Sequence, residues 1–119
     1  MERKKKVLIV DDEEVIQFLY QEELEEEGFA VETALNGELA LRQFEAAPPD
    51  LVILDINMPG MNGIEVLRQM KERNPGLPVI LSSAYPEYKQ DFGAWASDEY
   101  IVKSADTSAL KAAVHKYLD

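Results

Sequence analysis

The sequence predicts an α/β domain in which helices cover both faces of a parallel sheet. Short apolar runs rich in β-branched residues alternate with amphipathic segments of helical period, and this alternation occurs five times along the 119 residues. A repeated strand–helix order of this kind is typical of a doubly wound parallel sheet. The length suits one core, so we expect residues 1–119 to form a single domain.

Four short apolar runs are predicted to be strands buried on both faces, because each is too short for a helix and is rich in β-branched residues. These runs are residues 7–10, 51–54, 79–81 and 100–102. A fifth segment, residues 29–33, alternates apolar and polar side chains and predicts a strand at an edge of the sheet.

Four helices are predicted from apolar residues that recur at helical spacing. The marking residues are Ile16, Tyr20 and Leu24 in the first helix, Ala40 and Phe44 in the second, Ile64, Leu67 and Met70 in the third, and Leu110, Val114, Tyr117 and Leu118 in the last. Glycine or proline residues lie between several of the predicted strands and helices. Residues 86–98 have room for one more short helix, which Gly93 would end or weaken.

The composition excludes several classes of function. There is no cysteine, so disulfides and thiolate metal sites are excluded, and a reducing cytoplasm suits the chain. The basic start is not followed by the apolar segment of a signal peptide, and no apolar run approaches transmembrane length. The net charge of −11 disfavours direct binding to nucleic acid or an anionic membrane, and favours cations, basic protein surfaces or simple solubility.

Polar side chains follow four of the predicted strands. Because ligands bind beyond the carboxyl ends of parallel strands, we expect these side chains to meet at one edge of the sheet. They are Asp11 and Asp12 after the first strand, Asp55 after the third, Ser82 and Ser83 at the end of the fourth, and Lys103 after the fifth. Three carboxylates repel one another unless a cation lies among them, and an open site with oxygen ligands favours Mg²⁺.

This set of groups predicts phosphoryl transfer, in which charge neutralisation and positioning provide most of the catalysis. A carboxylate is a known nucleophile towards phosphoryl groups, and Asp55 lies centrally, so we predict Asp55 as the nucleophile. Asp11 and Asp12 would bind the metal. Lys103 would neutralise an anion, and a serine hydroxyl would donate to it.

Each of these residues also has an ordinary structural explanation. Asp12 would suit the N-cap of the following helix, and Asp55 would suit a turn. Ser83 and Lys103, each taken alone, would be an ordinary loop hydroxyl and a solvated lysine. The joint occurrence of these residues at successive strand ends favours a phosphoryl-transfer site over the separate structural explanations. His115, the only histidine, is predicted to be a surface residue or to complement the dipole of the last helix.

The chain resembles the receiver domain of two-component response regulators, of the chemotaxis-receiver type, over essentially its whole length. The matching stretches are VLIVDDEE, VETALNGELAL, PDLVILDINMPGMNGIEVL, VILSSA and DEYIVKS. The resemblance implies a flavodoxin-like sheet of order 2-1-3-4-5. It also implies a Mg²⁺-dependent phosphoacceptor signalling domain that catalyses only its own phosphorylation and dephosphorylation. The phosphoryl donor would be a sensor histidine kinase or a histidine phosphotransfer protein.

The resemblance also implies roles for the metal ligands and the acceptor. Asp55 would be the phospho-acceptor. Asp12, Asp55 and the backbone carbonyl of Asn57 would bind Mg²⁺ directly, and Asp11 would act mostly through a metal-bound water. Gly63, with Pro59, would shape the loop after the acceptor.

Further roles implied by the resemblance belong to signalling. Ser83 would bond the phosphoryl group, Lys103 would pair with it, and the small Ala84 would leave the site open to a donor. Tyr100 would be the aromatic switch that turns inward when Ser83 moves. A face formed by the short helix expected within residues 86–98, the fifth strand and the last helix would then signal to a protein partner.

The sequence departs from the family pattern in two places. The family usually has Lys-Pro, often with a cis bond, where this chain has Lys103-Ser104, and a cis bond to serine would cost about 3 kcal/mol more than a trans bond. The segment between Ser83 and Tyr100 is slightly short for the family. The sequence therefore does not identify the protein partner that binds this region.

Two other functions remain as alternatives. A Mg²⁺-dependent phosphatase with an aspartyl nucleophile, resembling the haloacid dehalogenase family, would carry a second aspartate where this chain has Asn57, and would need a cap domain. An interaction module of receiver fold that never carries phosphate would need a broken site. The chain ends with the last predicted helix, so we expect either a stand-alone receiver or one cut from a longer regulator.

Overall fold

The computed structural model describes residues 3–56, 60, 63–84 and 98–119. In this part of the chain, five strands and four helices follow in the order β1 (Lys6–Val10), α1 (Glu14–Glu26), β2 (Ala30–Ala34), α2 (Gly37–Ala46), β3 (Leu51–Asp55), α3 (Gly63–Arg73), β4 (Val79–Ser83), β5 (Glu99–Val102) and α4 (Ser108–Leu118). The strands pair in parallel in the order β2-β1-β3-β4-β5, which confirms the predicted fold class. The extra helix expected within residues 86–98 lies outside the described residues, apart from Asp98.

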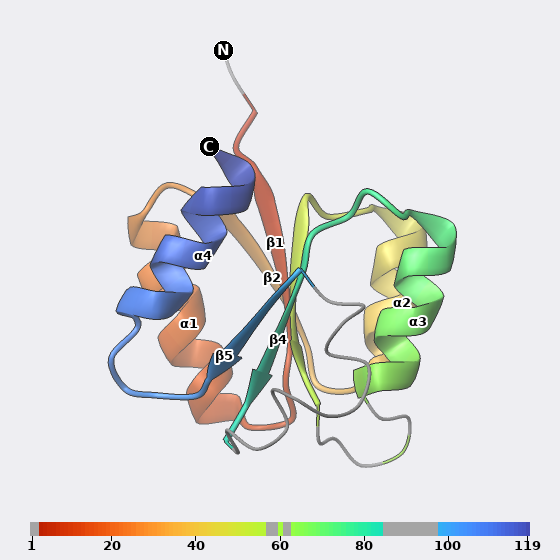
Figure 1. The fold of residues 1–119 in the computed structure, drawn as a ribbon, viewed down its shortest axis with the longest axis horizontal. Helices are drawn as coiled ribbons and strands as arrows, with labels where there is room; N and C mark the ends of the chain where they lie inside the picture. The colour runs from red at the N-terminus through yellow and green to blue at the C-terminus, as the bar shows by residue number, and fades with distance from the viewer. Residues whose placement is uncertain (1–2, 57–59, 61–62, 85–97) are drawn as a thin grey trace.

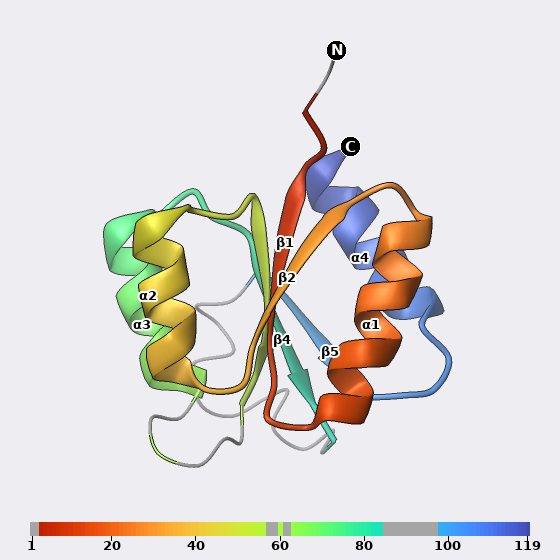
Figure 2. The same ribbon diagram turned by 180° about the vertical axis from the view of Figure 1, so that it is seen from behind.

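Two layers of helices enclose the sheet. α1 and α4 cover one face, and α2 and α3 cover the other, as Figures 1 and 2 show from opposite sides. Successive residues of a strand point to opposite faces, so Val7 and Ile9 of β1 belong to the core under α1 and α4, whereas Leu8 and Val10 belong to the core under α2 and α3. Burial on both faces explains why the central strands are continuous apolar runs.

The two edges of the sheet differ from its centre. β2 is an edge strand, as the alternation in residues 29–33 predicts. β5 forms the other edge, so the prediction that it is buried on both faces is wrong. Val102 is 43% exposed, while Ile101 is buried against the α1–α4 side. An edge strand has a neighbour on one side only, and it is therefore covered less completely.

The helices bury the faces that the apolar spacing predicts. Their buried residues include Tyr20 and Leu24 in α1, Ala40 and Phe44 in α2, Val66, Leu67 and Met70 in α3, and Leu110, Val114 and Leu118 in α4. At the start of α2, the Asn36 side chain accepts a hydrogen bond from the Leu39 amide at 2.9 Å, a normal N-cap contact. In the described part of the chain, every helix is too short or too polar to cross a membrane.

Candidate phosphoacceptor site

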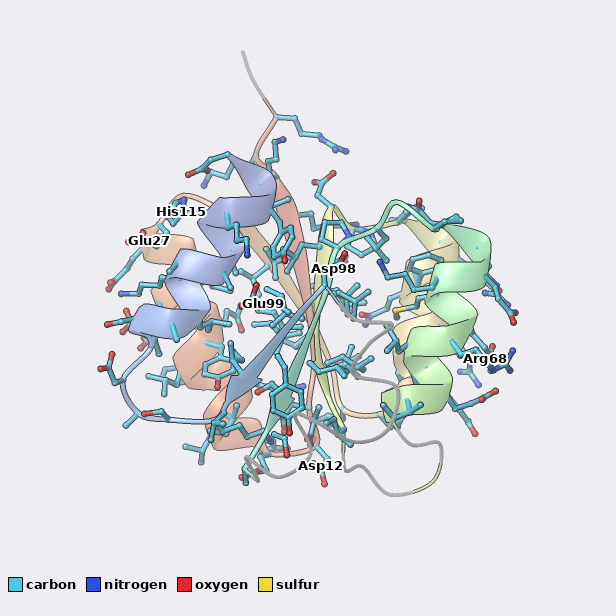
Figure 3. The ribbon with its side chains drawn as sticks, in the orientation of Figure 1. Asp12, Glu27, Arg68, Asp98, Glu99 and His115 are labelled. Carbon is cyan, nitrogen blue, oxygen red and sulfur yellow. The ribbon has the colours of Figure 1, made fainter. Side chains whose placement is uncertain are left out.

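The carboxyl ends of the strands bring the predicted carboxylates together. β1 pairs with β3 so that Val10 lies beside Leu54, and the following residues, Asp11 and Asp55, are neighbours at the edge of the sheet. One carboxylate oxygen each of Asp11, Asp12 and Asp55 lies within 4.8 Å of the others. Asp11 and Asp55 are buried, and Asp12 is exposed at the open end of the sheet (Figure 3). The three acids therefore form an oxygen-lined cluster that can hold a divalent cation.

Lys103 lies inside this cluster. Its Nζ is 2.8 Å from Asp11 Oδ2, 2.8 Å from Glu13 Oε1 and 3.4 Å from Asp55 Oδ2. The backbone amide of Lys103 donates to the Ser83 carbonyl at 2.7 Å, which holds the residue beside the end of β4. The Lys103–Ser104 peptide bond is trans. The lysine thus reaches the site without the Lys-Pro pair that the family usually has.

Burial and ion pairing set the protonation of this cluster. Burial raises the pKa of Asp11, while the hydrogen bonds from Lys103 and from the Glu13 amide oppose the rise. Burial alone would lower the pKa of Lys103, but the bonds to Asp11 and Glu13 and the charge of Asp55 raise it overall. The lysine is therefore a stable ammonium that neutralises part of the negative charge in the cluster.

The start of α1 shows that Asp12 does not cap the helix. The N-cap residue is Glu13, whose side chain makes no cap bond. Instead, Asp11 Oδ1 accepts from the Glu13 amide at 2.9 Å, and the Asp11 carbonyl accepts from Gln17 Nε2 at 2.8 Å. Gln17 also donates to the Ala34 carbonyl at 2.8 Å, which ties α1 to the end of β2. These bonds fix Asp11, and the exposed Asp12 is available to a cation.

Gly63 lets α3 begin directly against the end of β3. A Cβ atom at this position would lie 2.2 Å from the Asp55 carbonyl oxygen, far inside van der Waals contact. The Gly63 amide donates to the Ile56 carbonyl at 2.9 Å. The absence of a side chain at Gly63 therefore permits the close approach of α3 to the end of β3. Asn57 and Pro59, to which ligand and loop roles were assigned, lie outside the described residues.

The predicted switch residues share one face of the sheet. Ser83 ends β4 and is buried, while Ala84 follows it and is exposed. Tyr100 is half-buried and packs against the core under α2 and α3, on the face opposite to Ile101. Leu81 pairs in register with Tyr100, so alternation places Ser83, two residues further on, on the same face as that ring.

Three residues near the site were missed by the sequence analysis as functional candidates. Glu13 was grouped with an acidic helix start, yet it binds Lys103. Gln17 lies one residue after Ile16 and is buried, and Tyr20 was counted only as a core residue. A polar group at a helix position that faces the core was the available signal for Gln17 and Tyr20. Glu13 had no local signal.

Comparison with known proteins decides the family. The family model of the response regulator receiver domain matches residues 7–115.

This chain belongs to the response regulator receiver family.

Curated relatives agree with this assignment. Sporulation initiation phosphotransferase F of Bacillus subtilis is 38% identical over 115 residues, which cover 95% of this chain and 93% of that protein. The alkaline phosphatase synthesis transcriptional regulatory protein PhoP of the same organism is 37% identical over 116 residues, which cover 96% of this chain and 48% of that protein. The receiver domain described here thus spans about half the length of PhoP, and 52% of the phosphate regulon regulator PhoB of Rhizobium meliloti.

Solved receiver structures share the fold. The response regulator TrrA of Thermotoga maritima, in complex with Mg²⁺-BeF, superposes with a TM-score of 0.92 at 47% identity, covering 96% of this chain and 99% of that one. TrrA in complex with the histidine kinase ThkA gives a TM-score of 0.90 at 47% identity, and the match covers 97% of this chain and 99% of that one. The flavodoxin-like fold and the membership of the receiver family expected from the sequence are therefore confirmed.

Proposed function

We propose that Asp55 accepts the phosphoryl group from the phosphohistidine of a histidine kinase or a histidine phosphotransfer protein. The observation that carries this proposal is the position of Asp55, buried at the centre of the strand ends, inside the carboxylate cluster and 3.4 Å from Lys103. A carboxylate oxygen of Asp55 would attack phosphorus as the P–N bond breaks. The electron pair would stay on the imidazole nitrogen, which then takes a proton.

The same carboxylates form the proposed magnesium site. Asp12 and Asp55 would bind the ion directly, Asp11 would bind mainly through water, and the Asn57 carbonyl would complete the set. The ligands are oxygens only, which suits a hard cation, and TrrA was solved with Mg²⁺-BeF. When bound, Mg²⁺ neutralises charge on the phosphoryl oxygens. Lys103 bonds Asp11 in the structure, so metal binding and the position of this lysine should be coupled.

Ser83, Ala84 and Tyr100 are proposed to convert phosphorylation into a signal. Ser83 would donate to a phosphoryl oxygen, and Lys103 would pair with another. The exposed Ala84 presents little bulk to an approaching donor. Because Ser83 and Tyr100 lie on one face of neighbouring strands, a movement of Ser83 towards Asp55 would open space for the ring.

An exposed apolar surface next to the site is the proposed kinase-docking surface. Val15 and Phe18 of α1 are 80% and 62% exposed, and Leu35 and Leu39 extend the surface to the start of α2. Phe18 also lines a hollow between α1 and the end of β2. Apolar side chains this exposed, in a chain of net charge −11, suit a protein partner. The TrrA–ThkA complex supports a kinase as that partner.

The opposite edge of the sheet is the proposed output face. A groove between β5 and α4 is lined by Tyr100, Val102, Ala112 and Lys116, among others. We propose that a downstream protein binds this face, together with the short helix expected from the sequence within residues 86–98. Residues 1–119 would act as one domain that catalyses only its own phosphorylation and dephosphorylation. The acidic charge argues against direct binding to nucleic acid or membrane, and the absence of cysteine suits a cytoplasmic location.

Intact mass measured after incubation with acetyl phosphate, with and without Mg²⁺, tests the proposed function. We expect at most one phosphoryl group per chain, added only when Mg²⁺ is present, and no label on Asp55→Asn, which keeps the size of the side chain but removes the nucleophile. A labelled Asp55→Asn would mean that another aspartate is the acceptor. Steady hydrolysis of a phosphate ester would support the phosphatase, and an unlabelled wild type would support the interaction module.

A further inference from the structure

Two buried hydroxyls lie on the face of the sheet that carries the site. Tyr20 of α1 is 2% exposed and Ser82 of β4 is 1% exposed. Ser82 pairs in register with Asp55 on one side and with Ile101 on the other. Ile101 belongs to the core under α1 and α4, as does Ile80, two residues before Ser82. Alternation therefore directs the Ser82 hydroxyl into the same core as the Tyr20 ring.

Ser82 Oγ has no hydrogen-bond partner in the described part of the chain. Buried hydroxyls are nearly always paired, so an unpaired one at this position needs an explanation. An apolar residue would fit this core without losing a hydrogen bond. The hydroxyl lies on β4, between the strand that carries Asp55 and the strand that leads to Lys103. Its place is therefore beside the reacting groups.

The Tyr20 side chain belongs to the same buried cluster as Ile80 and Ile101, the neighbours of Ser82 on β4 and β5. Burial raises the pKa of Tyr20, while the nearby Ser82 hydroxyl and the Lys103 ammonium act in the opposite direction, and the charges of Asp11 and Glu13 add to the rise. α1 begins at the carboxyl end of the sheet, which brings its early turns over the strand ends (Figures 1 and 2). Tyr20 thus provides a second buried hydroxyl, in the core between α1 and the sheet.

We propose that Tyr20 and Ser82 form a hydroxyl pair that positions Lys103 when Asp55 carries a phosphoryl group. This inference rests on the function proposed for Asp55 and adds two positioning residues to it. In the structure, Lys103 Nζ donates to Asp11 and Glu13, each at 2.8 Å. An ammonium has three donors. When Asp55 is phosphorylated, Lys103 would keep Asp11, exchange the exposed Glu13 for a phosphoryl oxygen, and direct its third donor to another acceptor.

Ser82 Oγ would be that acceptor. A hydroxyl can accept two hydrogen bonds and donate one. Ser82 would accept from Lys103 and from the Tyr20 hydroxyl, and it would donate its own proton towards the Asp55 side chain. This arrangement gives a partner to Ser82 Oγ, which has none among the residues that the structure describes, and it orients the lysine from the core side of the sheet. Neither hydroxyl needs to touch the phosphoryl group.

Tyr20→Phe and Ser82→Ala each remove one hydroxyl and test the proposal. With acetyl phosphate and Mg²⁺, we expect each variant to be phosphorylated about three- to tenfold more slowly, which is the loss expected for one hydrogen bond. The double variant should be no slower than the slower single variant, because both hydroxyls act through one chain of bonds. In a Lys103→Met background, Tyr20→Phe should have no further effect.

A direct readout comes from NMR of the lysine side chains. With beryllofluoride and Mg²⁺ as a stable phosphoryl mimic, the ¹³Cε and ¹⁵Nζ signals of Lys103 should differ between wild type and Tyr20→Phe. Tyr117→Phe is the matched control. Its hydroxyl donates to the Asp98 carbonyl at 2.6 Å, at the other end of the sheet, so its removal should leave the rate and the Lys103 signals unchanged.

The possible outcomes separate this inference from the function on which it rests. If wild type is labelled, and both variants match it in rate and in Lys103 signals, the hydroxyl pair has no positioning role. Losses that add in the double variant, or that persist without Lys103, would show an effect of packing alone and would also overturn the proposal. An unlabelled wild type would overturn the function of Asp55 itself. Urea unfolding of each variant checks the fold, and Ser82→Ala keeps the test valid if Tyr20→Phe unfolds.

Discussion

At the scale of single residues, the site is built from charges that would be unfavourable in isolation. Asp11 and Asp55 are both buried at neighbouring strand ends, where like charges repel. Lys103 offsets this repulsion in the structure by contacting both carboxylates. A bound cation would offset it further. The positive charge of Lys103 therefore lowers the electrostatic cost of placing these carboxylates together.

Asp12 provides a clean test of the metal site, because it is exposed and does not cap α1. Asp12→Asn should weaken Mg²⁺ binding about tenfold or more, since even the loss of a group that only hydrogen-bonds to a metal ligand commonly costs about 10- to 100-fold in affinity. The same change should leave the melting temperature of the metal-free protein unchanged or slightly higher, because it relieves repulsion. Isothermal titration with Mg²⁺ and thermal unfolding in EDTA measure the two effects.

The control for this variant is Glu26→Gln, which removes one negative charge at the other end of α1 and should not change Mg²⁺ affinity. A large fall in the stability of metal-free Asp12→Asn would mean that Asp12 has a structural role after all.

At the scale of elements, α1 serves the core and the surface at the same time. One side of the helix buries Tyr20 and Leu24 against the sheet, while its outer side exposes Val15 and Phe18 beside the site. The acidic strand ends and the apolar helix surface thus lie together at one end of the molecule. This placement would let one partner contact α1 and present its phosphohistidine to Asp55.

Phe18→Ala separates docking from chemistry. Transfer from a phosphorylated histidine kinase should slow about tenfold, because truncating a buried interface aromatic commonly costs more than 1 kcal/mol. Phosphorylation by acetyl phosphate should keep its wild-type rate, because Phe18 belongs to the surface and not to the cluster. Val102→Ala, an exposed apolar residue on β5, is the control and should leave both rates unchanged. Equal slowing with both donors would place the effect of Phe18 in the site itself.

β5 and the end of β4 form the element pair that should respond to phosphorylation. Beryllofluoride with Mg²⁺ should shift the NMR signals of Ser83 and Tyr100 strongly, because the two side chains share one face of neighbouring strands. A tyrosine can change between half-buried and buried positions at modest cost, since its body is apolar and its tip is polar. Spectra without Mg²⁺ are the control. Shifts confined to Asp11, Asp12 and Asp55 would show that this aromatic does not relay the signal.

At the scale of the whole molecule, contacts distant from the site join the end of α1 to the C-terminal helix α4. His115 of α4 lies beside Glu27, which follows α1 directly (Figure 3). It also contacts Asp119. Its Nε2 is 2.8 Å from Glu27 Oε1, and its Nδ1 is 2.7 Å from Asp119 Oδ2. The centroid of the His115 ring also lies 5.2 Å from the centroid of the Phe29 ring. The surface position predicted for this histidine is correct, and its partners are two carboxylates.

These carboxylates raise the pKa of His115 above its ordinary value of about 6.5. A group whose pKa is raised on folding stabilises the folded state fully below the unfolded-state pKa, and this stabilisation is lost as the pH rises through the folded-state pKa. The difference in unfolding free energy between wild type and His115→Asn should therefore be largest below about pH 6.5 and smaller at alkaline pH. Urea unfolding from pH 5 to 9 and an NMR titration of the ring measure it. A pKa of His115 at or below 6.5 would contradict this expectation.

The strands and helices could be predicted from the sequence because their signals are local. Apolar runs and helical spacing are properties of adjacent residues. Each described strand begins and ends within two residues of its expected bounds, and each described helix contains the residues predicted to mark it. The prediction for β5 was wrong in its burial because the edge position of a strand depends on the order of the sheet. The register of neighbouring strands, which joins Ser82 to Asp55, is also a property of the assembled sheet.

For the site, the sequence by itself determined which reactive groups stand at the strand ends: Asp11, Asp12, Asp55, Ser83 and Lys103. Parallel strands in one sheet must place their carboxyl ends together, so this inference needed no coordinates. Only the tertiary structure decided that Lys103 contacts Glu13, 90 residues away, and that Tyr20 lies near Ser82. Both relations depend on how α1 packs across the strand ends, and that packing is set by the order of the strands and by the hand of their crossovers.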